Sequence, residues 1–309
     1  MAAAPPSGEL SYDSSNGIPT FWIAPARNFR TSARLHLQHF LFQNTLSHIL
    51  NPHIPSPVVA DSKPLKVADL GCGNGAWLID LDHELSNKGV SAQLDGYDIN
   101  TLNFPASAFL PSSISLKKLD IFARPLPEEM VGAYDIVHVR AFVSTIVNSD
   151  LTPLLSTVLA LLKPGGWLQW EESRAERFLV DSPSPSNEIP RTACDTIAHI
   201  LKAGGEARGL TFEFLGELDR HLQEHGFLDV CMQAVEKRKQ DLKGWTEDYL
   251  MVWEELAEFF PPKATVNQGQ VPMTRESWVE LFEKAVHETE QGIVIHQGKI
   301  MTVVGRKAA

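Results

Sequence analysis

The sequence predicts an α/β fold built on a doubly wound, mostly parallel sheet. Short apolar strands alternate with stretches of helical periodicity, and several strands end in an aspartate or in glycines. The chain has 309 residues, enough for one large domain with an appended lobe and for a core that needs no metal or disulfide. Hydrophobic residues make up 43% and charged residues 21%, so a wholly disordered chain or a repeat fibre is excluded.

Two segments precede the predicted sheet. Residues 1–30 begin with alanines and prolines followed by small polar residues, and we expect a flexible N-terminal segment. Residues 31–60 are expected to form a helical cap, because apolar side chains recur at helical spacing up to Leu50. The Asn51-Pro52 pair is expected to end this helix, since a residue before proline disfavours the helical conformation.

Residues 61–181 are expected to form the core of the sheet. Five apolar segments are predicted strands, at Lys66–Leu70, Ala92–Tyr97, Ser115–Leu119, Tyr134–Val139 and Trp167–Trp170. Helices are predicted between them at Ala76–Leu85 and Leu151–Leu162. This alternation favours parallel strands joined by helical crossovers.

Residues 182–309 are expected to complete the sheet and to carry a helical lid at about 240–291. A proline- and serine-rich stretch at 182–190 predicts a hinge. The elements predicted after the hinge are helices at about 191–203 and 213–225, a strand at Phe227–Glu236, two amphipathic helices within 244–290, and a last strand at Gly292–Arg306 with Gly298 as a candidate bulge.

Charge and composition exclude several classes of partner. The 27 basic and 38 acidic residues give a net charge of −11, and the basic clusters are short, so we expect no nucleic-acid partner. No apolar run approaches the roughly 18 residues of a membrane span, and no signal-peptide pattern opens the chain. Three cysteines without metal-ligand spacing are expected to be reduced thiols, and no metal site is predicted. A cytoplasmic location follows as an expectation.

The strongest local motif is a glycine-rich turn after the first predicted strand, at Asp69-Leu70-Gly71-Cys72-Gly73-Asn74-Gly75. Glycines at a strand-to-helix turn permit positive φ and a close approach of a ligand to the backbone. The spacing also satisfies the dinucleotide fingerprint of a nicotinamide dehydrogenase. Asp69 favours a different ligand, because a carboxylate repels a pyrophosphate but attracts an amine and a sulfonium. S-adenosylmethionine carries both of these cations.

Aspartates also follow the next two predicted strands. Asp98 stands 27 residues after Gly71, where a carboxylate can accept hydrogen bonds from both ribose hydroxyls. Asp120 ends the third strand, where it could accept the exocyclic amine of adenine. The neighbouring Ile99 and Ile121 are included among the candidate cofactor-binding residues.

Together these residues resemble the class I S-adenosylmethionine-dependent methyltransferases. The resemblance covers roughly residues 60–175 and implies a Rossmann-like sheet of seven strands, with an antiparallel last strand and helical N-terminal and C-terminal insertions. It implies that Asp69 to Gly75 form the cofactor loop and that Asp98 and Asp120 hold the ribose and the adenine.

A narrower resemblance is to fungal methyltransferases of secondary metabolism, a group that includes relatives of the velvet-complex regulator. It rests on the segments Arg34–His39, Val137–Arg140 and Gly165–Glu172. It implies a small, largely apolar natural product as the methyl acceptor, with O-methylation favoured. Two alternatives stay open: a cofactor-binding cyclase or pericyclase on the same scaffold, and a regulatory protein that acts through association.

Three side chains are candidates for proton transfer at the acceptor: His138, Glu171 and His39. His138 and Arg140 share one face of the fourth strand, and a polar pair on a buried strand needs a partner. Arg140, Arg34 and Gln38 are candidate cofactor-binding residues, with Arg34 near the methionine carboxylate. The alternative is structural, for example an ion pair of Arg140 with a nearby glutamate.

The candidate acceptor-binding residues come from the fifth strand and the lid: Trp170, Glu172, Trp245, Tyr249 and Trp253. An aromatic stripe at helical spacing is more often packing than a binding surface, and that reading stays open. A homodimer is one expected assembly.

Overall fold

The computed structural model describes residues 28–55, 64–175, 178–183, 189–263 and 273–309. Most of the predicted flexible N-terminal segment lies outside these residues, as do parts of the predicted cap, hinge and lid. The division into a cap, a core and a lid therefore stays a prediction.

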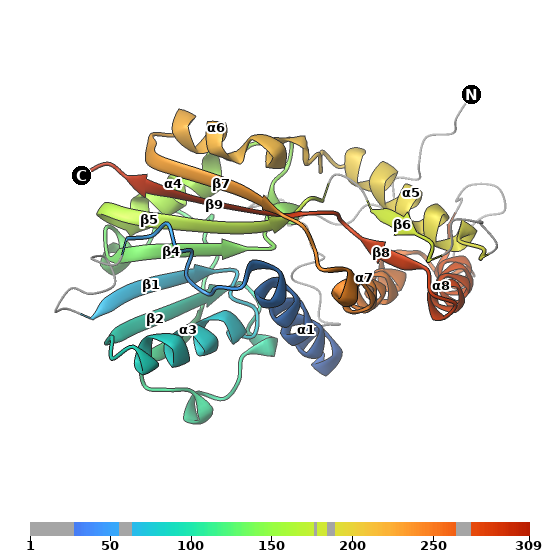
Figure 1. Cartoon of the computed structure of the whole chain (residues 1–309), viewed down its shortest axis with the longest axis horizontal. Coiled ribbons are helices and arrows are strands. Elements are labelled where there is room, and N and C mark those ends of the chain that lie inside the picture. Colours follow the sequence, from blue (N-terminus) through green and yellow to red (C-terminus); the bar gives the residue numbers. More distant parts are fainter. Residues whose placement is uncertain (1–27, 56–63, 176–177, 184–188, 264–272) are drawn as a thin grey trace.

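A seven-stranded sheet in the order β3-β2-β1-β4-β5-β9-β7 forms the centre of the molecule (Figure 1). Its strands are β1 (Leu65–Leu70), β2 (Ala92–Asp98), β3 (Ile114–Lys118), β4 (Tyr134–Arg140), β5 (Leu162–Ser173), β7 (Phe227–Val235) and β9 (Ile300–Lys307). Strand β9 lies between β5 and β7 and is antiparallel to both, while the remaining pairs are parallel. The predicted fold class, a mostly parallel sheet with an antiparallel last strand, is confirmed.

Helices cover both faces of this sheet. On one face lie α1 (Phe29–Leu46) and α3 (Ala76–Asn87); on the other lie α4 (Thr152–Leu161) and α6 (Leu218–Glu224) (Figure 1). Successive residues of a strand belong to two different hydrophobic cores, because their side chains point to opposite faces of the sheet in turn. Val67 and Ile136 pack with Trp77 of α3, whereas Ala68 and Val137 belong to the core of α4 and α6.

The cap helix ends four residues earlier than the sequence predicts. Asn28 caps its start by accepting a hydrogen bond from Arg30 N at 2.8 Å. Ser47 adopts the left-handed conformation with φ 62° and closes the last turn after Leu46. The chain then turns back to the sheet, so that Ile49 is buried beside β1 rather than on the helix.

The predicted last strand is two strands in two sheets. Gly298, with φ +64°, separates β8 (Val294–His296) from β9. Strand β8 pairs with β6 (Leu179–Asp181), which the sequence did not predict, in a separate two-stranded sheet. The prediction of one continuous strand with a bulge was wrong, because the left-handed residue turns the chain out of the large sheet.

The small sheet and three helices form a lobe beyond the carboxyl ends of the parallel strands (Figure 1). The helices are α5 (Thr192–Glu206), α7 (Leu242–Glu255) and α8 (Arg275–Glu290). Leu41 and Phe42 of α1 belong to the core of this lobe, while other residues of α1 face the sheet. Helix α1 therefore joins the lobe to the sheet.

We predict that Leu155→Ala lowers the free energy of unfolding by about 2–5 kcal/mol. Leu155 is fully buried between α4 and the sheet, so its truncation leaves a cavity. Urea unfolding monitored by circular dichroism measures the change. The control is Leu102→Ala, because Leu102 is 64% exposed and should cost little; equal losses at both positions would contradict the packing described here.

Candidate active site

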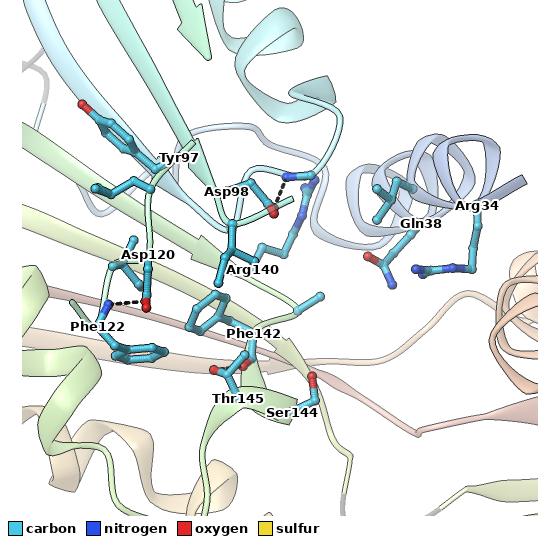
Figure 2. A pocket seen from close by; sticks show the side chains of 17 residues that line it. Arg34, Gln38, Tyr97, Asp98, Asp120, Phe122, Arg140, Phe142, Ser144 and Thr145 are labelled. Atoms are coloured by element: carbon cyan, nitrogen blue, oxygen red, sulfur yellow. Dashed lines mark hydrogen bonds between the residues drawn. The ribbon is translucent and has the colours of Figure 1, made fainter. Parts of the chain in front are cut away.

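A cavity opens at the carboxyl ends of β1, β2 and β4, beneath the N-terminal half of α1 (Figure 2). Its space amounts to about 910 Å³ when the open solvent at its mouth is included. Its lining residues are Arg34, Leu35, Gln38, Gly71, Gly73, Tyr97, Asp98, Ile99, Leu119, Asp120, Ile121, Phe122, Arg140, Ala141, Phe142, Ser144 and Thr145. All the candidate cofactor-binding residues except Asp69 and Gly75 lie on this wall.

The glycine turn forms one side of the cavity. Gly71 N–H and Cys72 N–H both donate to the carbonyl oxygen of Tyr97, at 2.8 and 3.0 Å. Gly71 has φ +70°, and a Cβ added there would lie 2.8 Å from the ring of Phe142. Only glycine combines this backbone conformation with this contact. Gly75 lies behind the wall and caps the N-terminus of α3.

The carboxylate of Asp98 fixes the glycine turn in place. Its Oδ2 accepts from Gly73 N–H at 2.9 Å and its Oδ1 accepts from Asn100 N–H at 2.8 Å. The Asp98 side chain also lines the cavity. Asp98 thus holds the loop and faces the space where a diol would be bound.

Asp120 lies at one end of the cavity, beside two apolar neighbours. Its Oδ1 accepts from Phe122 N–H at 2.9 Å, which holds the Phe122 ring at the wall (Figure 2). Ile121 is buried next to it. This end therefore combines a hydrogen-bond acceptor with flat apolar surfaces, the combination that suits an aromatic base.

Positive charge gathers away from Asp120. In Figure 2, Arg34 and Gln38 lie side by side on α1, at the opposite end of the cavity from Asp120, with Arg140 nearer the middle. Arg140 Nη2 lies 2.8 Å from Nδ1 of His39, and its guanidinium is 5.2 Å from the centre of the Phe42 ring. An anionic group of a ligand would be stabilised at this end.

His39 is a structural partner of Arg140 and does not line the cavity. Burial, followed by the charge of Arg140, lowers its pKa to about 4. The neutral ring accepts from Arg140 at Nδ1, so Nε2–H donates to Asp80 at 2.9 Å. Both ring nitrogens are therefore engaged in the protein, and the structure does not bring His39 to a reacting atom.

His138 lies in a buried charge cluster below the cavity floor. Its ring stacks on Trp77 at 3.6 Å, its Nδ1 lies 2.7 Å from Asp69 Oδ1, and its Nε2 lies 3.6 Å from Glu171 Oε2. Burial alone would lower the pKa of His138, but the two carboxylates outweigh it and raise the pKa. The same contacts lower the pKa of Glu171 against the effect of its own burial. The His138 ring therefore lies between the carboxyl groups of Asp69 and Glu171.

This cluster bears on three sequence-based hypotheses, which stay predictions. His138 and Glu171 are about 1% exposed, and Asp69 is 3% exposed and faces His138 on the neighbouring strand. None of the three lines the cavity. The alternation of side chains puts them all on the face covered by α1 and α3, where they contact one another.

The cluster continues through an amide that the sequence did not single out. Gln169 Nε2 donates to Glu171 Oε1 at 2.7 Å and to Ile49 O at 2.8 Å, while Gln169 Oε1 accepts from Asn51 N–H at 2.8 Å. These bonds tie the chain after α1 to β5. A glutamine on a strand and an asparagine before proline gave no signal of this contact, because it joins residues more than 100 positions apart.

Trp170 and Glu172 support the cavity wall from behind. Glu172 Oε1 accepts from Phe142 N–H at 2.6 Å and from the indole N–H of Trp170 at 2.9 Å. Burial raises the pKa of Glu172 to about 7 despite these bonds. Both side chains are about 1% exposed or less. That they face the acceptor stays a prediction; in the structure Glu172 is fixed against the segment after β4.

The aromatic residues of the predicted lid belong to the hydrophobic core of the lobe. Trp245, Tyr249 and Trp253 of α7 are buried, and Phe178 packs edge-on against Tyr249 and Trp253 at 5.1 and 5.4 Å. They are absent from the cavity wall. Their helical spacing reports the packing of α7 inside the lobe, so the structure does not support them as acceptor contacts.

Sequence reasoning missed the wall that follows β4. Phe142, Ser144 and Thr145 line the cavity, and Thr145 Oγ1 donates to Phe142 O at 2.8 Å. A signal was available, because residues directly after a parallel strand lie at the same edge as Asp98 and Asp120. The position alone did not single out Phe142, Ser144 and Thr145, since these residue types carry no charge.

Comparison with known proteins agrees with this geometry. Residues 37–236 match the family described as methyltransferase domain. The chain belongs to this methyltransferase family. The resemblance to class I S-adenosylmethionine-dependent methyltransferases and to fungal enzymes of secondary metabolism is confirmed. S-adenosylmethionine is the cofactor of the family.

Individual relatives of this methyltransferase are 25–34% identical to it over the residues that align. The methyltransferase grgD of Penicillium sp is 34% identical over 219 residues, which span 70% of this chain and 71% of grgD. The N-methyltransferase tcpN of Claviceps purpurea is 34% identical over 149 residues, 48% of this chain and 50% of tcpN. A solved phosphoethanolamine N-methyltransferase of Haemonchus contortus, in complex with S-adenosyl-L-methionine, has a TM-score of 0.50 at 15% identity and covers 95% of this chain and 61% of its own. This last likeness shows the fold.

Two kinds of feature are absent from the part of the chain that the structure describes. No helix there has both the length and the apolar character to cross a membrane. Nor do three or more described His, Cys, Asp or Glu side chains gather so that they could hold a metal ion.

We predict that His39 makes the stability of the methyltransferase fall on acidification. Its folded pKa of about 4 lies below the ordinary value of 6.5, so the unfolded chain binds more protons between these pH values. The contribution of His39 to the free energy of unfolding is fully present above pH 6.5. It decreases by up to about 3 kcal/mol as the pH falls to 4. In His39→Gln, unfolding midpoints in urea should therefore change less between pH 7 and pH 5 than in the wild type.

The control is the same substitution at His36, an exposed residue on the same helix. It should leave the acid-induced shift of the wild type intact. An equal shift in wild type and His39→Gln would show that His39 does not carry this dependence.

Proposed function

We propose that this methyltransferase uses S-adenosylmethionine to methylate a small natural product. The carrying observation is the cavity itself, in which Asp98 is fixed against the glycine turn, with Asp120 and Phe122 at one end and arginines toward the other. This order of groups matches the order of adenine, ribose and amino acid along the cofactor.

Each part of the cofactor has a complementary set of residues. Asp98 would accept the ribose hydroxyls, and Asp120 with Ile99, Ile121 and Phe122 would hold the adenine. The Gly71–Gly73 turn allows the chain of the methionyl group to pass close to the backbone. Arg34 and Arg140 would stabilise the methionine carboxylate, with Gln38 beside them.

The cofactor supplies an activated methyl group, which leaves sulfur as the acceptor atom forms its bond to carbon. The residues of the chain then have to align the acceptor and exclude water. Ala141, Phe142, Ser144 and Thr145, which follow β4, are the wall available for this task. Phe142 is fixed by Glu172, so this part of the wall is rigid on its inner side.

The lining bears on which atom is methylated. The sequence favoured an oxygen that loses a proton to His138, Glu171 or His39, but none of these lines the cavity. Among the described lining residues, the remaining candidates for a base are the two aspartates assigned to the cofactor. This supports an acceptor that is already nucleophilic, such as an amine nitrogen or an ionised oxygen. The name of tcpN, an N-methyltransferase, supports nitrogen.

We predict that Gly71→Ala weakens cofactor binding at least about a hundredfold, as measured by calorimetry. A hundredfold loss of affinity corresponds to about 3 kcal/mol of strain or lost contact. The new Cβ would meet Phe142 at 2.8 Å and force the turn away from Asp98. Gly89→Ala is the matched control, because Gly89 has φ +71° but nothing within 4 Å of an added Cβ. Equal losses in both variants would mean that backbone strain alone is responsible.

We also predict methyl transfer to a low-molecular-weight acceptor. Incubation of the protein with methyl-labelled cofactor and metabolite fractions should yield one equivalent of S-adenosylhomocysteine for each labelled product. Mass spectrometry and NMR of the product identify the methylated atom. Turnover without S-adenosylhomocysteine would instead support the cyclase alternative, and absence of cofactor binding would remove the proposal.

A further inference from the structure

A buried carboxylate from the lobe lies directly behind the cavity wall. Asp248 of α7 is fully buried, and its Oδ1 is 3.8 Å from Arg34 Nη1. Its Oδ2 accepts a long hydrogen bond of 3.5 Å from Gln38 Nε2. Arg34 and Gln38 are one turn apart on α1 and both line the cavity, whereas Asp248 does not.

We propose that Asp248 is a positioning residue, which holds Arg34 and Gln38 of α1 at the cavity so that they can bind the carboxylate end of the cofactor. This inference rests on the proposed function. It assigns the lobe a role in binding, although no residue of α7 touches the cavity.

Arg34 and Asp248 are close enough to attract each other but, at 3.8 Å, too far apart for a direct hydrogen bond. Arg34 is only 5% exposed, and its Nε has no hydrogen-bond partner, nor has Asp248 Oδ1. A buried guanidinium needs a counter-charge, and Asp248 supplies one at a distance beyond a direct hydrogen bond. The donors of Arg34 are therefore held near the cavity without being saturated by the protein.

Asp248 is itself held by groups on three elements. Arg34 and Gln38 face it from α1, Lys237 faces it from the segment after β7, and Tyr249 and Glu255 lie on its own helix. Burial raises its pKa to about 6, which the charges of Arg34 and Lys237 partly oppose. The negative charge of Asp248 is therefore lost progressively as the pH falls through about 6.

Lys237 completes the support from behind. Its ammonium lies 3.8 Å from the centre of the Trp245 ring and donates to Ser173 Oγ at 3.1 Å and to Tyr249 OH at 3.2 Å. Burial lowers its pKa to about 7. Trp245 and Tyr249 of α7 thus enclose the amino group of Lys237, which faces Asp248.

The test is calorimetric titration with S-adenosylhomocysteine at pH 7.5 and 5.5. Asp248→Asn keeps the shape and removes the charge, and it should weaken binding about tenfold at pH 7.5, as expected for the loss of a charged hydrogen-bonding partner. It should also reduce the difference in affinity between the two pH values. Glu247→Gln is the control, because Glu247 is half exposed on the same helix and pairs with Lys243; it should match the wild type.

A merely structural role is separated by a double-mutant cycle. If Asp248 acts through Arg34, Asp248→Asn should change the affinity less than about twofold in an Arg34→Gln background. Affinity within twofold of the wild type in the single variant, or the same tenfold loss in both backgrounds, would overturn the inference. If Asp248→Asn does not fold, the Arg34→Gln variant provides the test. Its affinity for S-adenosylhomocysteine should differ less between pH 7.5 and pH 5.5 than that of the wild type, and an unchanged difference would overturn the inference. Failure of the wild type to bind would instead refute the proposed function.

Discussion

The cluster of Asp69, His138 and Glu171 is the interaction on which the active-site half of the molecule depends. It joins three adjacent strands by side-chain contacts of 2.7 and 3.6 Å, in a place where every member is buried. Removing one member of such a cluster leaves an unpaired buried charge, which is far more costly than the net gain from the intact cluster. The carboxyl ends of β1, β4 and β5 are therefore fixed relative to one another.

Neighbouring contacts extend this constraint to α1. Gln169 connects Glu171 to the chain after α1, and His39 connects Arg140 to α1 itself. Helix α1 also contributes Leu41 and Phe42 to the core of the lobe. As a result, one helix carries the positive end of the cavity and is held from the sheet on one side and from α7 on the other.

Burial separates the residues that support the cavity wall from the residues that line it. The conspicuous titratable and aromatic side chains, such as His138, Glu172 and Trp245, are enclosed and set the shape of the wall. The wall itself consists of backbone, two aspartates, two arginines, a few uncharged polar side chains, and apolar and aromatic side chains. That composition fits a reaction in which the cofactor brings the reactive group and the protein provides alignment.

The sequence by itself determined the sheet, the glycine turn and the acids at the strand ends. These features are local: a glycine with positive φ, or an aspartate directly after an apolar strand, has much the same position in any parallel sheet of this kind. Tertiary structure decided which side chains reach the cavity. Asp69 and His138 were drawn inward because neighbouring strands placed them opposite each other, and the aromatic stripe of α7 was buried because β8 left the large sheet at Gly298 to build a lobe. Such outcomes depend on contacts between residues far apart in the chain, which periodicity and spacing do not encode.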